Sequence, residues 1–358
     1  MDVNERAKLI ESVGAEVLTH EELITLLTKK EHPIAYNGFE PSGRLHIAQS
    51  LYVAINVNKL IKAGCKFKIF VADWHAQANN KFGGDLEKIQ NCGKYFIEIW
   101  KACGMDLEHV EFVWASELVK DPAYWQLVLK IASANSVDRI KRCSQIMGRS
   151  DEDGLSAAQI LYPCMQAADV FYMGIDICEL GMDQRKVNIL AREMAPKFGY
   201  DKPIIVSHKM LMGLLEPPKD IADPVAKATA MKMSKSIPDS AIYTTDTTAD
   251  VTRKIRNAYC PAKIEEENPI LEYSKHLIFE RYDAFVIERP EKFGGNVTFN
   301  SYDELKDAFV AGNIHPMDLK NTVTKYINEL LEPVRAHFAN NKDASELKEL
   351  VESYTTTR

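Results

Sequence analysis

Five consecutive residues in the second half of the chain, Lys232-Met233-Ser234-Lys235-Ser236, bring together two ammonium groups and two hydroxyls. Such cationic and hydroxyl groups meet phosphate oxygens in proteins, so the segment is a candidate for chemistry on a phosphorylated substrate. A solvated basic loop has the same composition. The choice between the two interpretations depends on the other motifs of the chain.

A second segment, Gly38-Phe39-Glu40-Pro41-Ser42-Gly43, has the glycine spacing of a phosphate loop. A Walker loop is excluded because Arg44 and Leu45 stand where Lys and Ser or Thr are required. The segment still predicts a turn from a strand to a helix, where free backbone N–H groups and the helix dipole favour an anion. A purely structural turn remains the alternative.

His46 and Gln49 follow this turn, and we expect them on the first turn of the helix. Residues three apart lie on one helical face, which would put both side chains beside any bound phosphate. A structural histidine at this place is the alternative interpretation.

Tyr162, Gln166 and Asp169 are spaced i, i+4 and i+7, so a helix would display all three on one face. Their neighbours Leu161 and Met165 are apolar, which makes the three residues a polar stripe within an apolar helix. Such a stripe either binds a ligand or forms an internal hydrogen-bond network. The spacing leaves both possibilities open.

The elements that would position these residues alternate between strands and helices. Short apolar runs predict the strands, and apolar residues at helical spacing predict the helices between them. The predicted order is strand 34–39, helix 51–63, strand 67–72, helix 86–103, strand 110–114 and strand 203–206. This βαβαβ alternation predicts an α/β fold with a Rossmann-like, doubly wound parallel sheet.

The sheet is predicted to belong to a domain over residues 33–242. Within it, the region from about 117 to 150 lacks strand signals and is predicted as inserted helices, and a loop over 231–240 carries the basic motif. An N-terminal helical segment is predicted over residues 1–32, because Thr19 begins a capping-box sequence that precedes an apolar helical face.

Residues 243–358 are predicted to form an α-helical C-terminal domain, since helical patterns there are broken only by prolines. We expect the polar tail, residues 340–358, to form a frayed helix.

Composition limits the class of protein. The 358 residues are 46% hydrophobic and 27% charged, which is typical of a folded globular chain. The net charge of −7 provides no global positive field, so any contact with RNA must be local. The N-terminus lacks a signal pattern and no long apolar run is present, which predicts a cytoplasmic protein without membrane contact. The seven scattered cysteines indicate neither disulfides nor a metal site.

The chain resembles the class I aminoacyl-tRNA synthetases, since a His-Ile-Ala-Gln segment begins at His46 and the Lys-Met-Ser-Lys-Ser motif follows the last strand. More closely, it resembles the tyrosyl-tRNA synthetases of the archaeal and eukaryotic type. The matching motifs run in order from Pro33 to about Phe338: Tyr36-Asn37-Gly38-Phe39-Glu40-Pro41-Ser42-Gly43, Tyr162-Pro163-Cys164-Met165-Gln166-Ala167-Ala168-Asp169, Gly181-Met182-Asp183-Gln184-Arg185-Lys186 and His315-Pro316-Met317-Asp318-Leu319-Lys320.

The sequence departs from the family pattern at Ala48 and Gln49, where the first class I signature has Gly and a second His. Gln49 keeps a hydrogen-bond donor but cannot be cationic. The departure affects the phosphate contact rather than the reaction.

The resemblance implies which residues would bind the substrates. The phenol of tyrosine would bond to Tyr36 and Asp169, and its α-amino end would lie among Tyr162, Gln166, Gln184 and Glu40. ATP would be bound by Gly38, Ser42, Gly181, Asp183 and Ser234. The triphosphate would be surrounded by the implied catalytic residues His46, Gln49, Lys232 and Lys235.

The implied activity is that of a tyrosine–tRNA ligase. L-tyrosine would attack ATP, with Mg²⁺ on the departing phosphates, and the tyrosyl group would then pass to the terminal adenosine of tRNA(Tyr). The resemblance assigns Phe293 to stacking on an anticodon base and Asp318 to an anticodon guanine. It also implies a homodimer, with the inserted helices as its surface.

A basic cluster in the inserted region, Arg139, Lys141 and Arg142, is a candidate contact for the tRNA acceptor stem. An ordinary solvated helix face fits the same spacing.

Three other functions remain as alternatives. A tryptophanyl enzyme has a similar core, but Asp169 with Tyr36 suits a phenol better than an indole, which only donates. A non-catalytic tRNA-binding relative is disfavoured by the complete Lys232–Ser236 motif, and a nucleotidyltransferase would not require the C-terminal helices with Asp318.

Overall fold

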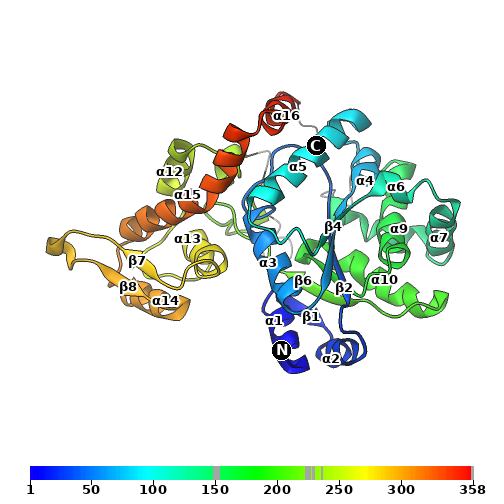
Figure 1. The fold of residues 1–358 in the computed structure, drawn as a ribbon, viewed down its shortest axis with the longest axis horizontal. Coiled ribbons are helices and arrows are strands. Elements are labelled where there is room, and N and C mark those ends of the chain that lie inside the picture. Colours follow the sequence, from blue (N-terminus) through cyan, green and yellow to red (C-terminus); the bar gives the residue numbers. More distant parts are fainter. Residues whose placement is uncertain (148–153, 222–226, 228–229, 235–236, 356–358) are drawn as a thin grey trace.

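The computed structural model describes residues 1–147, 154–221, 227, 230–234 and 237–355, without the side chains of residues 145 and 293. Figure 1 shows a larger part around a central β-sheet and a smaller, mostly helical part beside it. Within the described residues the central sheet has six strands, in the order β1-β6-β5-β2-β3-β4. They are β1 (Gly14–Leu18), β2 (Ile34–Phe39), β3 (Lys66–Val71), β4 (Val110–Trp114), β5 (Ile177–Gly181) and β6 (Ile204–His208).

The pairing of the strands confirms the predicted doubly wound sheet. All neighbours run parallel except β1, which pairs antiparallel with β6 at the edge of the sheet. The predicted strands 34–39, 67–72, 110–114 and 203–206 correspond to β2, β3, β4 and β6. The sequence reading missed β5, a short strand whose apolar pattern is interrupted by Glu179.

Helices cover both faces of the sheet. Successive strand residues point to opposite faces, so Ala35 and Ile69 belong to one hydrophobic core and Tyr36 and Phe70 to another. The first core includes side chains from α1 (Val3–Glu11), α2 (His20–Lys29), α3 (Leu51–Lys62) and α5 (Leu86–Ala102). The second includes side chains from α7 (Pro122–Ser133), α9 (Ala157–Tyr172) and α10 (Arg185–Phe198).

Shorter elements connect these helices and strands. They are α4 (Asp73–Ala78), η1 (Lys81–Gly84), α6 (Ala115–Leu118), α8 (Val137–Lys141), η2 (Ser144–Met147), η3 (Met182–Gln184) and η4 (Pro238–Ser240). Helices α7 and α8 lie in the region predicted as inserted helices. Figure 1 places α7 at the outer edge of the larger part, away from the smaller part.

The sequence predicted a helical segment over residues 1–32. The structure corrects this prediction, because the strand β1 occupies Gly14–Leu18. Five residues are too few to show a period in the sequence, and pairing with β6 covers an otherwise open sheet edge. The helix predicted after Thr19 is confirmed as α2, and the Thr19 hydroxyl accepts a hydrogen bond from the N–H of Glu22.

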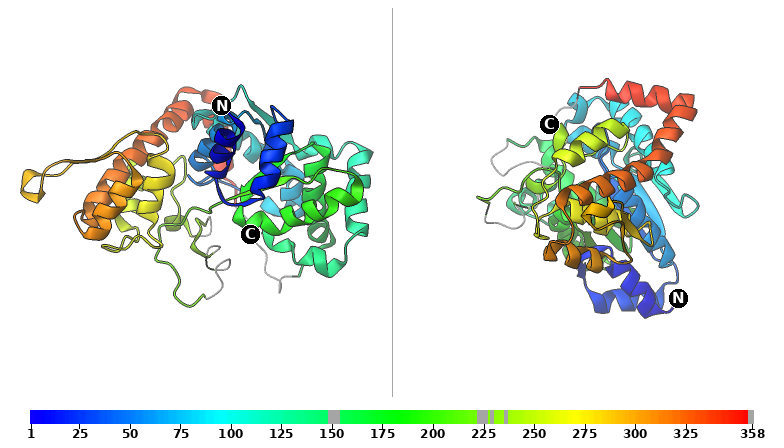
Figure 2. Two further views of the ribbon diagram at one scale, coloured as in Figure 1. Left: turned by 90° about the horizontal axis from the view of Figure 1, so that it is seen from below. Right: turned by 90° about the vertical axis from the view of Figure 1, so that its left-hand side faces the viewer.

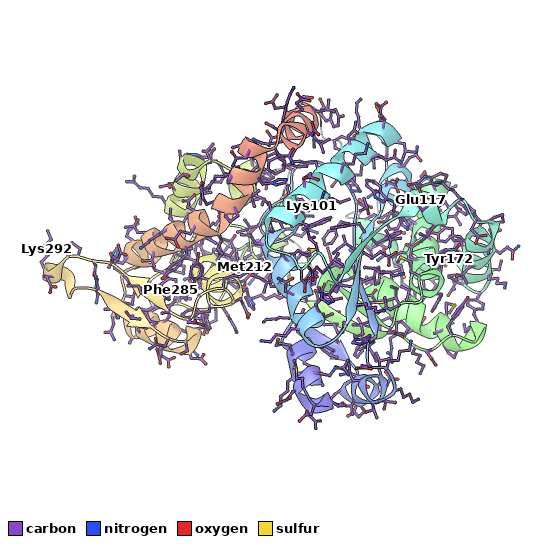
Figure 3. The ribbon with its side chains drawn as sticks, viewed as in Figure 1. Lys101, Glu117, Tyr172, Met212, Phe285 and Lys292 are labelled. Atoms are coloured by element: carbon purple, nitrogen blue, oxygen red, sulfur yellow. The ribbon has the colours of Figure 1, made fainter. Side chains whose placement is uncertain are left out.

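The smaller part consists mainly of helices, as predicted, but it also contains an antiparallel hairpin that the sequence did not reveal. Its strands have only three residues each, too short for a recognisable alternation. Figure 2 shows the hairpin projecting away from the sheet, and Figure 3 places Lys292 at its tip. The elements are α12 (Thr248–Asn257), α13 (Pro269–Tyr273), η5 (Ser274–Ile278), β7 (Phe285–Ile287), η6 (Glu291–Phe293), β8 (Val297–Phe299), α14 (Tyr302–Ala311), α15 (Pro316–Asn340) and α16 (Lys342–Glu352).

The tail is more ordered than the predicted frayed helix. Helix α16 turns back from α15 and packs against α5 of the larger part (Figure 1). Ala344 and Val351 are buried in this contact, which explains why a polar segment forms a defined helix. Among the described helices, none is long and apolar enough to cross a membrane.

Candidate active site

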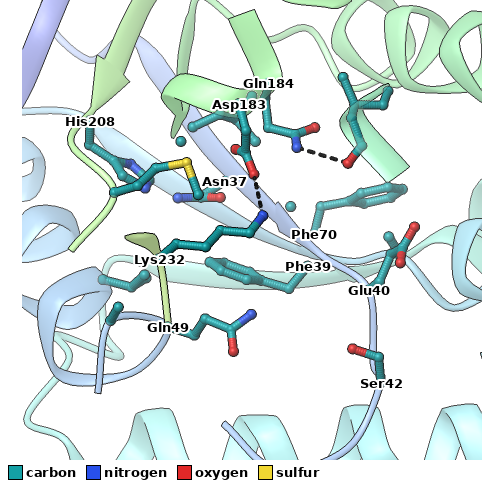
Figure 4. Close-up of a pocket in the computed structure, with 18 of the residues that line it drawn as sticks. Asn37, Phe39, Glu40, Ser42, Gln49, Phe70, Asp183, Gln184, His208 and Lys232 are labelled. Atoms are coloured by element: carbon teal, nitrogen blue, oxygen red, sulfur yellow. Dashed lines mark hydrogen bonds and ion pairs between the residues drawn. The ribbon is translucent and has the colours of Figure 1, made fainter. Parts of the chain in front are cut away.

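The carboxyl ends of β2 and β5 border a cavity with a volume of about 380 Å³. These two strands are neighbours, and the sheet continues to β3 on one side and to β6 on the other. Open α/β sheets bind ligands at such a switch point. Figure 4 shows Glu40, Asp183 and Lys232 around the cavity, from three separate segments of the chain.

One end of the cavity is formed by buried polar side chains. Asp169 and Tyr36 are each 1% exposed. Tyr124 donates a hydrogen bond to Oδ1 of Asp169 at 2.8 Å, and Nε2 of His75 lies 2.9 Å from Oδ2. The Tyr36 hydroxyl and Oδ2 of Asp169 make no aligned hydrogen bond to any described residue. A polar ligand group can therefore bond to both.

The charges at this end are set by burial and by neighbouring carboxylates. Burial alone would lower the pKa of His75, but Asp169, Glu40 and Asp73 raise this pKa above its usual value. The imidazole is thereby favoured as a cation that compensates Asp169. Burial, with Cys178 and Asp169, raises the pKa of Tyr36 well above its usual value, so its phenol stays neutral and able to donate.

Helix α9 presents the predicted polar stripe to the cavity. Tyr162, Gln166 and Asp169 all line it, which confirms that they share one face. The amide of Gln166 donates to the side-chain oxygen of Gln184 at 3.2 Å, and Gln184 in turn donates to the carbonyl of Ile146 at 3.2 Å. The ring of Tyr162 meets that of His75 edge-on, with centroids 5.0 Å apart.

Glu40 adds a carboxylate to the middle of the cavity. The Asn79 amide lies 3.1 Å from both of its oxygens, and Nζ of Lys81 lies 3.8 Å from Oε2. Asn79 is fully buried, so the carboxylate of Glu40 is held in a fixed direction. An ammonium group of a ligand would be stabilised beside it.

The expectation that His46 and Gln49 lie on the first turn of a helix is wrong, because α3 begins only at Leu51. His46 instead forms an isolated bridge with Tyr243, and the N–H of Ile47 donates to the carbonyl of Ile242 at 2.9 Å. These pairings keep the segment out of the helix. The turn at Gly43, where φ is +111°, therefore does not lead directly into a helix N-terminus.

His46 and Gln49 nevertheless line the cavity, as do Gly38 and Ser42 from the segment that follows the strand. On the opposite wall lies Gly181, at the end of β5. A Cβ atom at this position would lie 2.7 Å from Oδ1 of Asp183, so glycine leaves room for that carboxylate beside the cavity.

The basic motif contributes Lys232 and Ser234 to the cavity, and both residues line it. Nζ of Lys232 lies 3.3 Å from Oδ2 of Asp183 (Figure 4). Lys235, the second lysine of the motif, lies outside the described residues. The described part of the motif thus supplies one ammonium group to the cavity.

His208 lines the cavity and contacts Glu179, and the sequence analysis singled out neither residue. Glu179 is fully buried, and its carboxylate accepts a hydrogen bond from Asn37 at 2.8 Å and contacts Nδ1 of His208 at 2.5 Å. Burial lowers the pKa of His208, but Glu179 and Asp183 raise it overall. His208 ends β6, a position where a polar residue could have been suspected, whereas Glu179 lies in the middle of β5, the strand that the sequence did not reveal.

His75 and Tyr124 were also missed. His75 follows the end of β3 in α4, where a polar residue could have been suspected, whereas Tyr124 lies among the inserted helices and is brought to Asp169 only by the packing of α7 on α9. Within the described residues, no group of three or more His, Cys, Asp or Glu side chains is arranged to hold a metal ion.

The residues predicted to contact tRNA lie outside the cavity. Arg139 pairs with Glu193 at 2.8 Å, whereas Lys141 and Arg142 are exposed. Asp318 lies in the first turn of α15, in the smaller part of the molecule. The side chain of Phe293 lies outside the described part of the structure, and its backbone ends η6 in the projecting hairpin.

Comparison with known proteins identifies the family to which the chain belongs. The sequence profile of the tRNA synthetases class I (W and Y) matches residues 28–332. The chain is 51% identical over 360 residues to tyrosine–tRNA ligase 1, cytoplasmic, of Arabidopsis thaliana, covering 100% of this chain and 90% of that protein.

Two solved structures are also similar. The tyrosyl-tRNA synthetase of Pyrococcus horikoshii complexed with L-tyrosine superposes with a TM-score of 0.91 at 39% identity, covering 98% of this chain and 100% of that one. The tyrosyl-tRNA synthetase of Leishmania major in complex with tyrosinol superposes with a TM-score of 0.89 at 45% identity, covering 100% of this chain and 61% of that one.

Proposed function

Because the chain belongs to the class I tRNA synthetases of the tryptophan and tyrosine type, we propose that it is a tyrosine–tRNA ligase. It activates L-tyrosine with ATP to tyrosyl-adenylate and pyrophosphate, and then transfers the tyrosyl group to the terminal adenosine of tRNA(Tyr). The tyrosine–tRNA ligases with which it aligns over nearly its whole length support this reaction.

The observation that carries the choice of tyrosine is the buried end of the cavity. There, Oδ2 of Asp169 accepts and the Tyr36 hydroxyl donates or accepts, and neither has an aligned hydrogen bond within the described structure. A phenol hydroxyl can donate to the carboxylate and bond to Tyr36 at the same time. An indole offers only one N–H donor, so it suits this pair of groups less well.

The rest of the amino acid extends from that end along α9. We assign its α-amino group to Tyr162, Gln166 and Gln184, with Glu40 supplying negative charge nearby; all four line the cavity. The carboxylate of the substrate then points toward His46 and Lys232, where ATP binds.

ATP occupies the wall formed by the ends of β2 and β5. We assign the ribose to Gly181 and Asp183, and the remaining contacts to Gly38, Ser42 and Ser234. The triphosphate, which enters as its Mg²⁺ complex, lies among His46, Gln49, Lys232 and Lys235. Because Lys232 is paired with Asp183 here, ATP binding exchanges this ion pair for contacts of Asp183 with ribose and of Lys232 with phosphate.

Catalysis needs no general base, because the attacking carboxylate of tyrosine is already ionised at neutral pH. It attacks the α-phosphorus in line, and the bond to the bridging oxygen of pyrophosphate breaks. Lys232 and Lys235 stabilise the negative charge that develops on pyrophosphate, and His46 and Gln49 donate hydrogen bonds to it. The enzyme therefore works by positioning and electrostatics.

We assign tRNA to both parts of the chain. Residues 33–242 form the catalytic domain, and residues 243–358 form the anticodon-binding domain, in which Phe293 stacks on a base and Asp318 accepts from a guanine. Lys141 and Arg142, with Arg139, provide local positive charge for the acceptor stem.

The enzyme is proposed to act as a homodimer in the cytoplasm. Leu129 on α7 and Val137 on α8 are 59% and 63% exposed, at the edge of the larger part where the inserted helices lie. Exposed apolar side chains of this size can be buried in a subunit contact. The word cytoplasmic in the name of the Arabidopsis relative supports the location.

The proposal is tested by ATP–pyrophosphate exchange with each of the twenty amino acids in turn. We expect the wild-type chain to catalyse exchange with tyrosine and at most a trace with tryptophan or phenylalanine. Exchange that is fastest with tryptophan would assign the chain to the other branch of its family, and no exchange with any amino acid would overturn the proposal.

A further inference from the structure

The segment from Ser42 to His46 carries two ATP contacts of the proposed site but belongs to no helix or strand, apart from the single bridge at His46. Its backbone must therefore be held by other segments. The N–H of Gly43 donates to Sγ of Cys92 in α5 at 3.2 Å, and the carbonyl of Leu45 accepts from the N–H of Thr244 at 2.9 Å.

Arg44 lies in the middle of this segment and anchors it through two carboxylates. It does not line the cavity. Nη2 of Arg44 lies 3.0 Å from Asp246, which is 4% exposed, and Nε lies 3.3 Å from Oε1 of Glu352. Its guanidinium also packs over the ring of Tyr243, 4.3 Å from the centroid. Arg44 therefore joins the ATP segment to two other parts of the chain.

One of those parts is the end of the C-terminal tail. Glu352 ends α16, and its Oε1 also accepts a hydrogen bond from the Thr245 hydroxyl at 3.1 Å. Two residues later, the Tyr354 hydroxyl accepts from the Asn91 amide at 3.2 Å, and its ring meets that of Phe82 with centroids 5.6 Å apart. The tail is thus docked on α5 and η1, with Glu352 directed at Arg44.

We propose that this tail is a positioning element for ATP: Glu352 fixes Arg44 and so holds Ser42 and His46 at the cavity, while Tyr354 anchors the tail end. The proposal rests on the proposed function, which assigns ATP to Ser42 and His46. Glu352 and Tyr354 touch no substrate and act through Arg44. The physical basis is the planar guanidinium, whose Nη2 faces Asp246 while Nε faces Glu352, a geometry that the single nitrogen of a lysine does not reproduce.

A tail that only stabilises the fold makes a different prediction. Loss of stability lowers the fraction of active enzyme and hence the apparent kcat, whereas a displaced ATP segment weakens ATP binding and raises the KM for ATP. The tyrosine contacts on α9 and β2 are held by other residues, so the KM for tyrosine separates a local effect from a general one.

The test is tyrosine-dependent ATP–pyrophosphate exchange by the full-length chain, with both KM values measured for Glu352→Ala and Tyr354→Ala. We expect the KM for ATP to rise about two- to fivefold, the range of a partly exposed ion pair, with the KM for tyrosine unchanged. The matched control is Glu346→Ala on the same helix, whose carboxylate pairs only with Lys342 of α16, at 3.6 Å. It should change neither value.

A double-mutant cycle identifies Arg44 as the connection. In an Arg44→Met background, which removes the cation, Glu352→Ala should have no further effect on the KM for ATP. The positioning role would be overturned if the KM for ATP were unchanged both in Glu352→Ala and in the milder Glu352→Gln. It would also be overturned if the effects of the Arg44 and Glu352 substitutions on this KM were additive. Absence of exchange by the wild-type chain would instead refute the proposed function, so the two failures are distinguishable.

Discussion

Asp169 receives a hydrogen bond from Tyr124 through one oxygen and faces His75 through the other. These contacts fix the direction of a carboxylate that is 1% exposed, although the pair with His75 is not an aligned hydrogen bond. The Tyr36 hydroxyl, from a residue that lines the same cavity, has no aligned hydrogen bond to a described residue. A buried polar group without a partner costs roughly 1–3 kcal/mol. Under the proposed function, the phenol of tyrosine would bond to the Tyr36 hydroxyl and add a donor to the Asp169 carboxylate, whereas phenylalanine would do neither. The proposal thus makes discrimination between the two amino acids depend on Asp169 and Tyr36.

We therefore expect Asp169→Ala to abolish most of the preference for tyrosine over phenylalanine. The measurement is kcat/KM for both amino acids in pyrophosphate exchange. The control is Glu111→Ala on the edge strand β4, because that side chain is 65% exposed and its carboxylate lies 3.6 Å from Nζ of Lys68. If folded Asp169→Ala retained the original preference, the phenol pocket would have to be placed elsewhere.

His75 gives the same pocket a pH dependence. Its pKa is raised above the usual value of about 6.5 by Asp169, Glu40 and Asp73 against the effect of burial. A raised pKa in the folded protein means that the imidazolium contributes stability that is complete below the unfolded pKa and is lost as the pH rises through the folded pKa. Stability and tyrosine binding should thus decline above about pH 6.5.

We expect His75→Gln to remove this decline and to lower kcat/KM for tyrosine, since breaking a buried pair by removing one partner costs about 3–5 kcal/mol. Thermal unfolding and exchange are measured between pH 6 and 9 for both proteins. A pH profile of the variant that parallels the wild type would show that another group is responsible.

The strands that carry the site were partly visible in the sequence. β2, β3, β4 and β6 are apolar runs bounded by turn residues, whereas β5 contains Glu179 and β1 is a short edge strand whose stability comes from pairing with β6. The residues at β7 and β8 form only three pairs, which no local pattern can reveal. The sequence analysis thus missed the strands that depend on long-range pairing and show no hydrophobic pattern of their own.

The same contrast between local pattern and long-range packing holds for the residues of the site. The stripe Tyr162, Gln166 and Asp169 was predictable because one helix fixes its geometry. The position of His46 was not, because its bridge to Tyr243 depends on a segment nearly two hundred residues away in sequence. The contact of Tyr124 with Asp169 likewise requires the packing of α7 against α9.

Helix α15 offers a test of the division of labour between the two parts. Asp318 lies in its first turn, apart from the residues that line the cavity. We expect Asp318→Ala to lower kcat/KM for charging tRNA(Tyr) about tenfold, the effect of losing one base contact, and to leave pyrophosphate exchange unchanged. Asp307→Ala on α14, whose side chain is 76% exposed, is the control. Equal loss in both reactions would make Asp318 a structural residue.

The outer edge of the larger part carries exposed apolar side chains among polar ones. Leu129 and Phe198 line a shallow groove there, and Leu129 is 59% exposed. Placing a charge in a subunit contact opposes association because the charge must be desolvated. We expect Leu129→Asp to convert a dimer to a monomer in sedimentation velocity at micromolar concentration. Val310→Asp, at an exposed position of α14, should leave the dimer intact. A wild-type chain that sediments as a monomer would contradict the homodimer.

The proposed function requires the whole molecule to combine a pocket for tyrosine, a wall for ATP and a helical part for tRNA, so the most direct measurement is complete charging by the wild-type chain. Transcripts of tRNA(Tyr) and tRNA(Trp) are each incubated with the enzyme, ATP and either labelled tyrosine or labelled tryptophan. We expect label to be attached only in the reaction of tyrosine with tRNA(Tyr). Attachment of tryptophan to tRNA(Trp), or no attachment to tRNA(Tyr) by an enzyme active in pyrophosphate exchange, would contradict the assignment.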